Sequence, residues 1–562
     1  MPRKIVVIGG VAAGPKAAAR ARRVDPEAEI TIIEKEEILS YAGCGLPYWI
    51  SGVVKEEKEL ISTPIGVLRD PKFFAKAKDI KALNRTEALE IDRERKVVHC
   101  QKLENDGKLE IPYDKLVIAT GSAPIELKVE GAHLKNVTQL KDPDDAARLR
   151  EAFSTACRKV TIVGGGLIGC EMTEAVRECG KLATIVEMQP RLLPGLLDDD
   201  LTLLLEKNLR EQGITILTNS RVERLEGNDD GEVRKVVTAD GREIDTEFVL
   251  MAVGVRPVVD LARKAGLDIG ENGGIKVNSH MQTSDPDIYA AGDCVEHLAS
   301  FVCELMLWPM GSVANKEGRV AGTNVAGGEE TFRGIVGTNV LKVFNQNVGR
   351  TGLTSRGCEK LGLKTTTVVT ASPDRAHYYP TAKPIVLKAI VETKSRRLLG
   401  VQGIGPGDVV KRMDIAATAI ARKMTIDEVA NLDLGYAPPY SSAMDPLINL
   451  ANVMRNKLDG MFEGISAVEV KQKLDSGNDF VFLDVRSQDE YDTVHLPEST
   501  LIPLGALRDR LEELPTEGEI ITFCKISLRG YEAARILTGR GFKNVKVMEG
   551  GVLAWPFETE SS

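Results

Sequence analysis

Through its first two-thirds, the chain alternates short β-branched runs with helical stretches and glycine turns. The runs Ile5–Ile8 and Val160–Val163 are examples, and each leads directly into a glycine-rich loop. This alternation is typical of βαβ units that share a parallel sheet. The loops at residues 9 and 164 are of the nucleotide-binding type, and two such units in one chain indicate two bound nucleotides.

The pattern changes in the part of the chain that follows. Strand-like runs at Thr366–Thr370 and Ile385–Glu392 precede a helical pattern near Val409–Arg422, which predicts a third domain. Residues 446–464 have the character of a connecting helix and linker, and residues 465–556 form a compact final unit. The predicted fold class is therefore α/β with several domains.

Length and composition agree with this organisation. At about 150 residues per domain, a chain of 562 residues predicts three or four domains. Its 73 basic and 82 acidic side chains give a net charge of −9, which argues against a dedicated nucleic-acid surface. The sequence has no long apolar run and no signal-peptide pattern, so we expect a cytoplasmic protein without a membrane span. The nine cysteines are scattered and odd in number, which favours reduced thiols.

The first glycine loop runs from Gly9 to Gly14, between a strand and a helix that begins near Pro15. Glycines allow a tight turn close to a pyrophosphate, which the free N–H groups of a helix N-terminus then bind. The next strand ends at Glu34, whose carboxylate can bind ribose hydroxyls. Val11 stands where the usual pattern has its middle glycine, and an ordinary βαβ turn without a ligand is the alternative.

The second loop, Gly164–Gly169, matches G-x-G-x-x-G in full, and the strand after it ends at Glu187. A carboxylate at that position accepts a hydrogen bond from a ribose 2′-hydroxyl and repels a 2′-phosphate. The sequence therefore favours NADH over NADPH at this loop, with a purely structural loop as the alternative.

Two further segments resemble motifs of the pyridine nucleotide-disulfide oxidoreductases. Leu116–Gly121 resembles the crossover segment of these flavoproteins, and Asp287–Asp293 resembles their second FAD fingerprint, whose aspartate contacts the ribitol. The resemblance covers roughly residues 1–445 and implies FAD in the first unit, NADH in the second, and a homodimer built by the third domain. On this resemblance the cofactor-binding residues are Gly9, Gly10, Ala12, Gly14, Glu34, Lys35, Thr120, Gly121, Asp293, Gly164, Gly166, Gly169 and Glu187.

Cys44 follows the second strand of the FAD fold, in a connection that lies near the flavin in this family. Gly45 and Pro47 indicate that a helix begins just after the sulfur, and a helix N-terminus lowers a thiol pKa. Dithiol members carry a second cysteine five residues on, where this chain has Trp49. Cys44 is therefore expected to act alone, through a mixed disulfide, a persulfide or a sulfenic acid. The alternative is a cysteine that serves as a small buried hydrophobe.

Single-cysteine members of the family fall into two groups. The peroxidases and oxidases keep a histidine in the first glycine loop, and this chain has none there. The run Cys44–Tyr48 instead resembles coenzyme A-disulfide reductases and their persulfide-reducing relatives, in which two tyrosines of the partner subunit flank the sulfur. Tyr378 and Tyr436 fit those places, where a phenol can protonate a departing thiolate. Tyr379 and Tyr440 compete for the same roles, and buried core tyrosines are the alternative.

A coenzyme A site is also suggested, by five polar residues near the N-terminus. They are Lys16, Arg20, Arg23, Ser40 and Lys72. The first three are spaced to share one helix face, which suits the phosphates of an ADP group. The last two match positions that bind coenzyme A in those reductases. A solvated basic face is the alternative, and the chain departs from the family pattern at Gly43, usually asparagine, and at Met444, where a lysine is expected.

The final unit resembles a single rhodanese domain. The strand Ile520–Phe523 delivers Cys524 into a turn before a helix. Backbone N–H groups around such a turn stabilise a thiolate or persulfide anion, and Arg529 adds positive charge. Ser527 stands where a glycine is common, which argues against efficient use of thiosulfate. An inactive docking module is the alternative.

With these resemblances, the predicted architecture has two Rossmann-like dinucleotide-binding domains, an α+β dimerisation domain and an α/β rhodanese domain. The expected ranges are 1–150 and 251–325 for the FAD-binding domain, 151–250 for the NADH-binding domain, 326–445 for the dimerisation domain, 446–464 for the linker and 465–556 for the rhodanese-like domain.

The resulting hypothesis is NADH-dependent reduction of sulfane sulfur at Cys44, with Cys524 as the sulfur carrier. The substrate would be coenzyme A persulfide, a polysulfide or a related compound, and fusing the carrier to the reductase raises its effective concentration. A coenzyme A-disulfide reductase with an accessory rhodanese unit is one alternative. A redox sensor in which coenzyme A caps Cys44 is the other. Neither a metal, a nucleic acid nor a membrane is expected as a partner.

Overall fold

The chain forms two units in the computed structural model, which describes residues 1–154 and 157–561. The first unit comprises Met1–Met188 and Ser220–Ile335, and the second comprises Gln189–Asn219 and the chain from Val336 onward. Among the described residues, no helix has the length and apolar character needed to cross a membrane.

A parallel sheet at the start of the chain carries the first glycine loop. Its strands, in spatial order, are β18 (Ile288–Ala290), β7 (Lys115–Ile118), β1 (Lys4–Ile8), β2 (Glu29–Ile33) and β3 (Lys81–Leu83). Residues Ile5–Ile8 of β1 are all buried, as the continuous apolar run predicts for a parallel strand that is covered on both faces.

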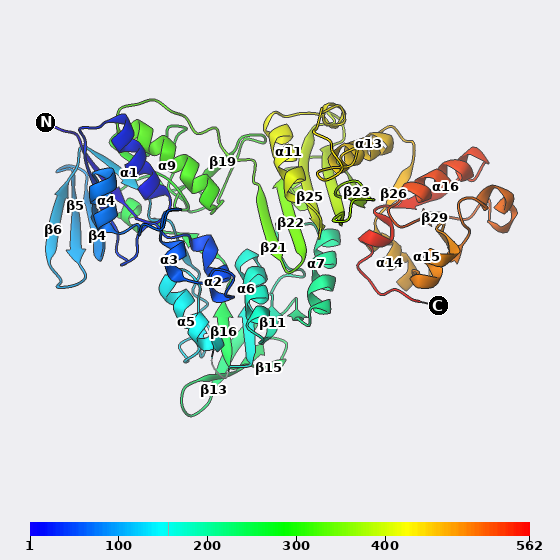
Figure 1. Cartoon of the computed structure of the whole chain (residues 1–562), viewed down its shortest axis with the longest axis horizontal. Helices are drawn as coiled ribbons and strands as arrows, with labels where there is room; N and C mark the ends of the chain where they lie inside the picture. The colour runs from blue at the N-terminus through cyan, green and yellow to red at the C-terminus, as the bar shows by residue number, and fades with distance from the viewer. Residues whose placement is uncertain (155–156, 562) are drawn as a thin grey trace. The chain divides into compact units, whose positions relative to one another are not determined.

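Helices α1 (Ala13–Val24) and α9 (Gly311–Val325) lie side by side in this unit (Figure 1). Small residues make their close approach possible. A Cβ at Gly318 would lie 2.4 Å from the carbonyl oxygen of Ala13, and one at Gly322 would lie 2.3 Å from that of Ala17. This packing fixes α1, and therefore the helix N-terminus that follows the first glycine loop.

The second glycine loop belongs to another parallel sheet of the same unit. The adjoining strands are β11 (Leu182–Val186), β10 (Lys159–Val163), β16 (Phe248–Met251) and β9 (Val137–Thr138), and α6 (Leu167–Glu178) packs on β10 and β11. The register repeats that of the first sheet, because Val163 pairs with Val186 as Ile8 pairs with Ile33. In both sheets, therefore, the loop strand and the strand that ends in glutamate finish at the same level.

Smaller elements complete the first unit. They are the helices α2 (Leu46–Ile50), α3 (Glu57–Leu60), α4 (Pro71–Lys78), α5 (Pro143–Ser154) and α8 (Asp260–Lys264), and the strands β4 (Thr86–Asp92), β5 (Val97–Lys102), β6 (Lys108–Pro112), β8 (Ser122–Pro124), β13 (Val222–Gly227), β14 (Val233–Thr238), β15 (Glu243–Asp245), β17 (Val255–Pro257), β19 (His297–Ala299) and β20 (Glu304–Met306).

An antiparallel sheet forms the first part of the second unit. Its strands, in spatial order, are β21 (Asn339–Val343), β22 (Gln346–Gly352), β25 (Leu398–Gly405), β24 (Pro384–Glu392) and β23 (Thr365–Pro373). The predicted strands at 366–370 and 385–392 and the helix near 409–422 are confirmed, the last as α11 (Val410–Ala421) on β22 and β25. The connecting helix is α13 (Pro446–Leu458), which packs on β23 and β24 instead of forming a loose linker.

A parallel sheet forms the C-terminal part of the second unit. Its strands, in spatial order, are β26 (Glu463–Ile465), β30 (Val545–Met548), β29 (Ile520–Phe523), β27 (Val481–Asp484) and β28 (Thr500–Leu501). Helices α14 (Ala467–Asp475), α15 (Gln488–Thr493) and α16 (Leu528–Gly539) belong to it. The predicted strand at 520–523 is therefore confirmed, and Cys524 follows it directly.

Glu549 joins the two sheets of the second unit. This buried side chain directly follows β30, and its carboxylate accepts hydrogen bonds from the backbone N–H of Val369 at 2.9 Å and from Lys457. Burial raises the pKa of Glu549. The ion pair with Lys457 and the hydrogen bond from Val369 meet at this one buried carboxylate. Together they hold the C-terminal sheet against β23 and α13.

We expect Glu549→Ala to lower the free energy of unfolding by about 2 kcal/mol, because Lys457 loses its carboxylate and the Val369 N–H loses its acceptor. The measurement is the midpoint of thermal unfolding followed by circular dichroism. Glu558→Ala, which removes an exposed carboxylate from the same part of the chain, is the control and should change the midpoint little. Equal midpoints for both variants would refute the structural role of Glu549.

Candidate active site

The first glycine loop has the backbone that a dinucleotide requires. Gly9 has a φ of +112°, and a Cβ there would lie 2.1 Å from the carbonyl oxygen of Ala119, so only glycine fits. Helix α1 follows with no side-chain cap at Ala12 and no acidic residue in its first turn. Its N-terminal N–H groups are therefore available for a pyrophosphate.

The acidic residue at the end of the next strand is fixed in the same way in both nucleotide units. The N–H of Gly10 donates to Glu34 at 2.6 Å, and the N–H of Gly165 donates to Glu187 at 2.7 Å. Both glutamates are buried. A carboxylate that its own loop orients in this way can accept hydrogen bonds from ribose hydroxyls, as predicted for these positions.

The start of α6 also leaves room for a ligand. Gly166 caps this helix without a side-chain bond, and nothing lies within 4 Å of the position of a Cβ there. The first turn of α6 holds no acidic residue. The two loops, their helix N-termini and the two glutamates therefore fit two dinucleotides, while Lys35 beside Glu34 is exposed.

The second FAD fingerprint meets the crossover segment. Asp293 accepts a hydrogen bond from the Ser122 hydroxyl at 2.9 Å, and burial raises the pKa of Asp293. Thr120 donates to the Val258 carbonyl at 2.6 Å, and Gly121 turns the chain with a φ of +68°. The structure thus brings Thr120, Gly121 and Asp293 into one neighbourhood, as the family resemblance implies.

A buried pair that the sequence analysis missed supports this fingerprint. Glu317 on α9 accepts the N–H of Gly292 at 2.9 Å and lies 3.4 Å from Nε2 of His297. Nδ1 of His297 accepts the N–H of Trp308 at 3.2 Å, and its Nε2 faces the Glu317 carboxylate. The pair ties the residue before Asp293 to helix α9.

Cys44 is exposed and lies in the turn Gly43–Gly45, immediately before α2. The predicted helix start is therefore confirmed, but the predicted lowering of the thiol pKa is wrong. Partial desolvation of the sulfur by the surrounding protein, followed by the charges of Glu171 and Asp293, raises the pKa of Cys44. The helix that follows the thiol, α2, has only 5 residues.

Glu171 on α6 is the functional candidate that the sequence analysis missed beside Cys44. Burial and the neighbouring Glu174 raise the pKa of Glu171 to about 7. Its charge in turn raises the pKa of both Cys44 and Tyr48. Glu171 therefore changes its charge near neutral pH, and that change alters the ionisation of the Cys44 thiol. The available signal was an acid on the helix that opens directly after the second glycine loop.

The residues predicted to bind coenzyme A differ in their surroundings. Lys16 and Arg23 on α1 and Lys72 on α4 are exposed. Arg20 is half-buried, donates to the Thr323 hydroxyl at 2.8 Å and lies 3.8 Å from Glu330. Ser40 has a φ of +51°, and its N–H donates to the Gly10 carbonyl at 2.7 Å. Three of these positions therefore offer free surface, and Arg20 is partly engaged inside the unit.

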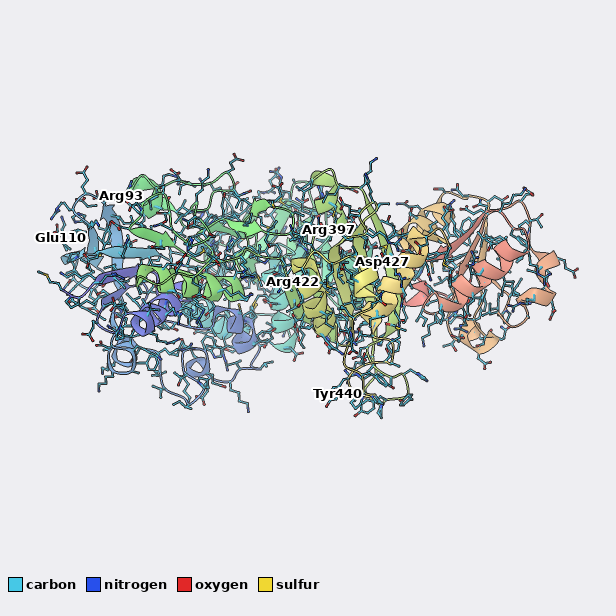
Figure 2. All side chains as sticks on the ribbon, turned by 90° about the horizontal axis from the view of Figure 1, so that it is seen from above. Arg93, Glu110, Arg397, Arg422, Asp427 and Tyr440 are labelled. Carbon is cyan, nitrogen blue, oxygen red and sulfur yellow. The ribbon has the colours of Figure 1, made fainter. Side chains whose placement is uncertain are left out.

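The two predicted tyrosines are neighbours in the second unit. Tyr378 and Tyr436 are 65% and 53% exposed, and a hydrogen bond between their side chains raises the pKa of Tyr378. Tyr378 therefore keeps its phenol proton near neutral pH. Tyr440, one of the competing residues, is 70% exposed and projects from a surface loop (Figure 2).

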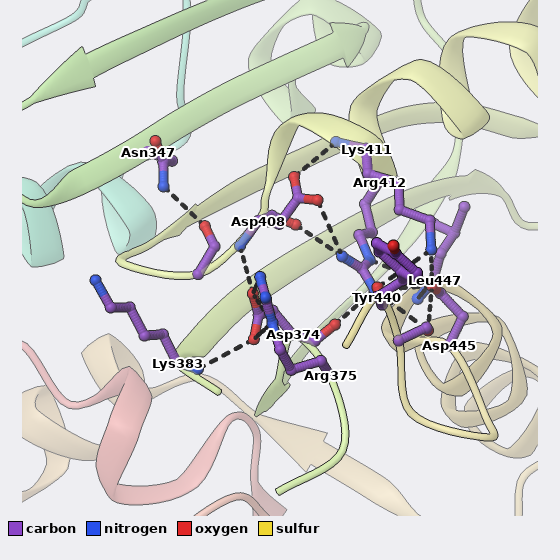
Figure 3. Close-up of polar contacts among 12 residues, drawn as sticks. Asn347, Asp374, Arg375, Lys383, Asp408, Lys411, Arg412, Tyr440, Asp445 and Leu447 are labelled. Carbon is purple, nitrogen blue, oxygen red and sulfur yellow. Dashed lines mark hydrogen bonds and ion pairs between the residues drawn. The ribbon is translucent and has the colours of Figure 1, made fainter. Parts of the chain in front are cut away.

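The buried Arg412 and the partly exposed Arg375 hold together the two loops that carry these tyrosines (Figure 3). Arg412 donates to the Asp374 carbonyl at 2.7 Å and to Asp445 at 2.8 Å. Arg375 donates to the Pro439 carbonyl at 3.1 Å and pairs with Asp374. The two loops are therefore joined directly by the Arg375–Pro439 hydrogen bond and indirectly through Arg412, which restrains the tyrosine pair.

Cys524 lies at the predicted strand-to-helix turn and is fully buried. Arg529 makes a side-chain hydrogen bond to Cys524 and two further bonds to Glu490, at 2.7 and 2.8 Å. Ser527 has a φ of +76°, which explains why glycine is common there, and its hydroxyl donates to the Met548 carbonyl at 2.8 Å. The sequence analysis named Arg529 but assigned no role to Glu490.

Metal chemistry has no evident place in the parts of the chain that the structure covers. No group of three or more His, Cys, Asp or Glu residues there could hold a metal ion. The nine cysteines are all free thiols.

Comparison with known proteins agrees with this geometry. The family model described as pyridine nucleotide-disulphide oxidoreductase matches residues 3–318, its dimerisation domain matches 339–448, and the rhodanese-like domain matches 466–557. The NAD(P)H sulfur oxidoreductase (CoA-dependent) of Pyrococcus abyssi is 37% identical over 454 residues, which cover 81% of this chain and 98% of that protein.

Two solved structures resemble nearly the whole chain. A NAD-dependent persulfide reductase from A. fulgidus is 44% identical with a TM-score of 0.94, and the match covers 98% of this chain and 100% of that one. Reduced CoADR-RHD from Bacillus anthracis is 34% identical with a TM-score of 0.91, covering 99% of this chain and 98% of that one.

We expect Glu171→Gln to lower the pKa of Cys44, because it removes a charge that raises that pKa. Above about pH 7 the native carboxyl is mostly ionised, so the variant thiol should react roughly threefold faster with iodoacetamide at about pH 8. Mass spectrometry of the Cys44 peptide across the pH range measures this rate. Glu178→Gln, an exposed change on the same helix, is the control. Equal rates for the two variants would contradict the coupling.

Proposed function

The chain belongs to the pyridine nucleotide-disulphide oxidoreductase family, and we propose that it is an FAD-dependent NADH reductase of sulfane sulfur. Coenzyme A persulfide or a polysulfide would be the substrate. One combination carries the proposal: the exposed thiol of Cys44, at a turn before a helix in the unit with two dinucleotide loops, shares a chain with Cys524 at a strand-to-helix turn. The relatives named for CoA-dependent sulfur and persulfide reduction support it.

The family uses FAD and NAD(P)H, which supply an electron pair when bound. Gly9, Gly14 and Glu34 would hold the FAD together with Asp293, and Gly164, Gly166 and Glu187 would hold the nicotinamide nucleotide. Because Glu187 is buried and oriented by Gly165, it disfavours a 2′-phosphate. This geometry supports NADH as the electron donor.

Cys44 would act as the nucleophile. Its thiolate attacks one sulfur of the substrate's S–S bond and displaces the other, which leaves a disulfide-type bond on Cys44. Two electrons and a proton then restore the thiolate and release the second product. For a persulfide the balanced sum is RSSH + NADH + H⁺ → RSH + H₂S + NAD⁺. Glu171, with a pKa of about 7, is suited to move the proton that the departing sulfur needs.

Tyr378 and Tyr436 would complete the site from the partner subunit. The match to the family's dimerisation domain supports a homodimer. The hydrogen bond between the two tyrosines raises the pKa of Tyr378, so its phenol stays protonated and could donate a hydrogen bond to a leaving thiolate.

Coenzyme A would bind at the exposed cations of the first unit. Lys16, Arg23 and Lys72 are free to meet phosphates, and Arg20 would contribute after rearranging away from Thr323. Cys524 would carry sulfane sulfur as a persulfide and pass it towards Cys44. The nine free thiols support a reducing, cytoplasmic setting.

A second candidate is a coenzyme A-disulfide reductase with an accessory rhodanese-like domain. The resemblance to CoADR-RHD of Bacillus anthracis over nearly the whole chain favours it. Both functions need Cys44, FAD and NADH, so the substrate alone separates them.

Anaerobic assays of sulfide release and NADH oxidation test the proposal. Cys44→Ser should abolish both with coenzyme A persulfide, since no nucleophile remains, while Cys524→Ser should lower the rate with polysulfide several-fold. Faster turnover of coenzyme A disulfide than of either persulfide or polysulfide would favour the second candidate. Sulfide release that survives Cys44→Ser would refute the proposed chemistry.

Tyr378→Phe should lower kcat by about tenfold and change KM much less, because the phenol acts on the departing thiolate. The measurement is steady-state NADH oxidation with coenzyme A persulfide. Tyr440→Phe, which alters an equally exposed tyrosine of the neighbouring loop, is the matched control and should leave kcat unchanged. A loss in KM alone would assign Tyr378 to substrate binding instead.

A further inference from the structure

Arg529, which interacts with the buried Cys524, is already neutralised by a carboxylate. Both guanidinium donors of Arg529 that face Glu490 bond to its two carboxylate oxygens, at 2.7 and 2.8 Å. This fork-to-fork arrangement holds the pKa of Glu490 at about 2, with Arg529 as the main cause. Near neutral pH the pair therefore carries no net charge.

The charge of a second arginine in the same domain, Arg486, is also neutralised by a carboxylate. Arg486 is buried and bonds to Asp484 through Nε and Nη2, with the shortest contact at 2.6 Å. Lys525 follows Cys524 and is exposed. The two arginines are therefore each neutralised by a carboxylate, which leaves Lys525 and the backbone N–H groups of the turn to attract an incoming anion.

We propose that Glu490 determines the donor specificity of the Cys524 site. Its negative charge disfavours dianionic sulfur donors such as thiosulfate relative to singly charged donors. The attraction between a donor and this loop scales with the product of their charges. Removing the negative charge of Glu490 therefore favours a dianion more than a monoanion. The inference rests on the proposed function, because it names the class of donor that loads the proposed sulfur carrier.

The loading step has the same chemistry for both kinds of donor. The Cys524 thiolate attacks the outer sulfur of thiosulfate, the S–S bond breaks, and sulfite leaves: Cys–S⁻ + S–SO₃²⁻ → Cys–S–S⁻ + SO₃²⁻. Benzenethiosulfonate reacts in the same way and releases benzenesulfinate, but it carries a single negative charge. Cyanide then takes the outer sulfur as thiocyanate and restores the thiolate. Comparison of these two donors isolates the charge.

Glu490→Gln is a sharp test because it changes the charge and little else. Glu490 also closes a capping box with Ser487 at the start of α15, and glutamine can fill that place equally well. Its amide oxygen can still accept a bond from Arg529. Asp489→Asn makes the same change of charge on an exposed residue of the same helix, and so is the matched control.

We expect Glu490→Gln to raise kcat/KM for thiosulfate about tenfold and for benzenethiosulfonate about threefold in the cyanide-coupled assay. The gain should shrink as potassium chloride is added, since salt screens the uncovered charge of Arg529. Asp489→Asn should alter the ratio of the two donors less than twofold. An unchanged ratio in Glu490→Gln, with thermal unfolding like that of the native protein, would overturn the proposal.

The native protein supplies a second measurement that does not depend on the variant's folding. Its kcat/KM for thiosulfate should depend only weakly on ionic strength, because the two arginines are each neutralised by a carboxylate. A steep decline with salt would overturn the proposal. Neither assay needs NADH or Cys44, so a failed NADH assay would leave this result standing, and the reverse also holds.

Discussion

The molecule depends on backbone N–H groups that bind negative charge where side chains supply no cation. Gly10 and Gly165 donate to Glu34 and Glu187, and the uncapped N-termini of α1 and α6 remain open for a pyrophosphate. In the proposed function, the turn after Cys524 would use the same kind of donor for a sulfur anion. Because these donors belong to the fold itself, each site keeps its geometry whether or not nearby arginines are engaged elsewhere.

The features that the sequence predicted well are those that depend on the local conformation of the backbone. Gly9 and Gly164 are required by a positive φ and by a carbonyl oxygen that would collide with any Cβ, and a short motif encodes both needs. Cys44 was singled out because a turn and a helix start surround it, and the structure has both. The glycine preference at position 527 has a similar local cause, a φ of +76° that serine accepts while bonding to Met548.

The features that the sequence did not predict come from residues far apart in the chain. Desolvation of the sulfur, followed by the charges of Glu171 and Asp293, raises the pKa of Cys44, and only the fold brings these groups near it. The pair of His297 and Glu317 and the contact between Glu490 and Arg529 likewise join separate elements. Periodicity shows which face of a helix is buried, but it does not show which carboxylate will meet which cation.

A thiol with a raised pKa, such as Cys44, is poorly suited to nucleophilic attack unless a neighbouring group such as Glu171 can change its charge. Glu171 titrates near neutral pH, so the charge that opposes the Cys44 thiolate is itself removed by one proton. When Glu171 is protonated, the Cys44 thiolate faces one negative charge fewer. The ionisation of Cys44 therefore depends on a carboxyl of a separate helix as well as on the desolvation of the sulfur.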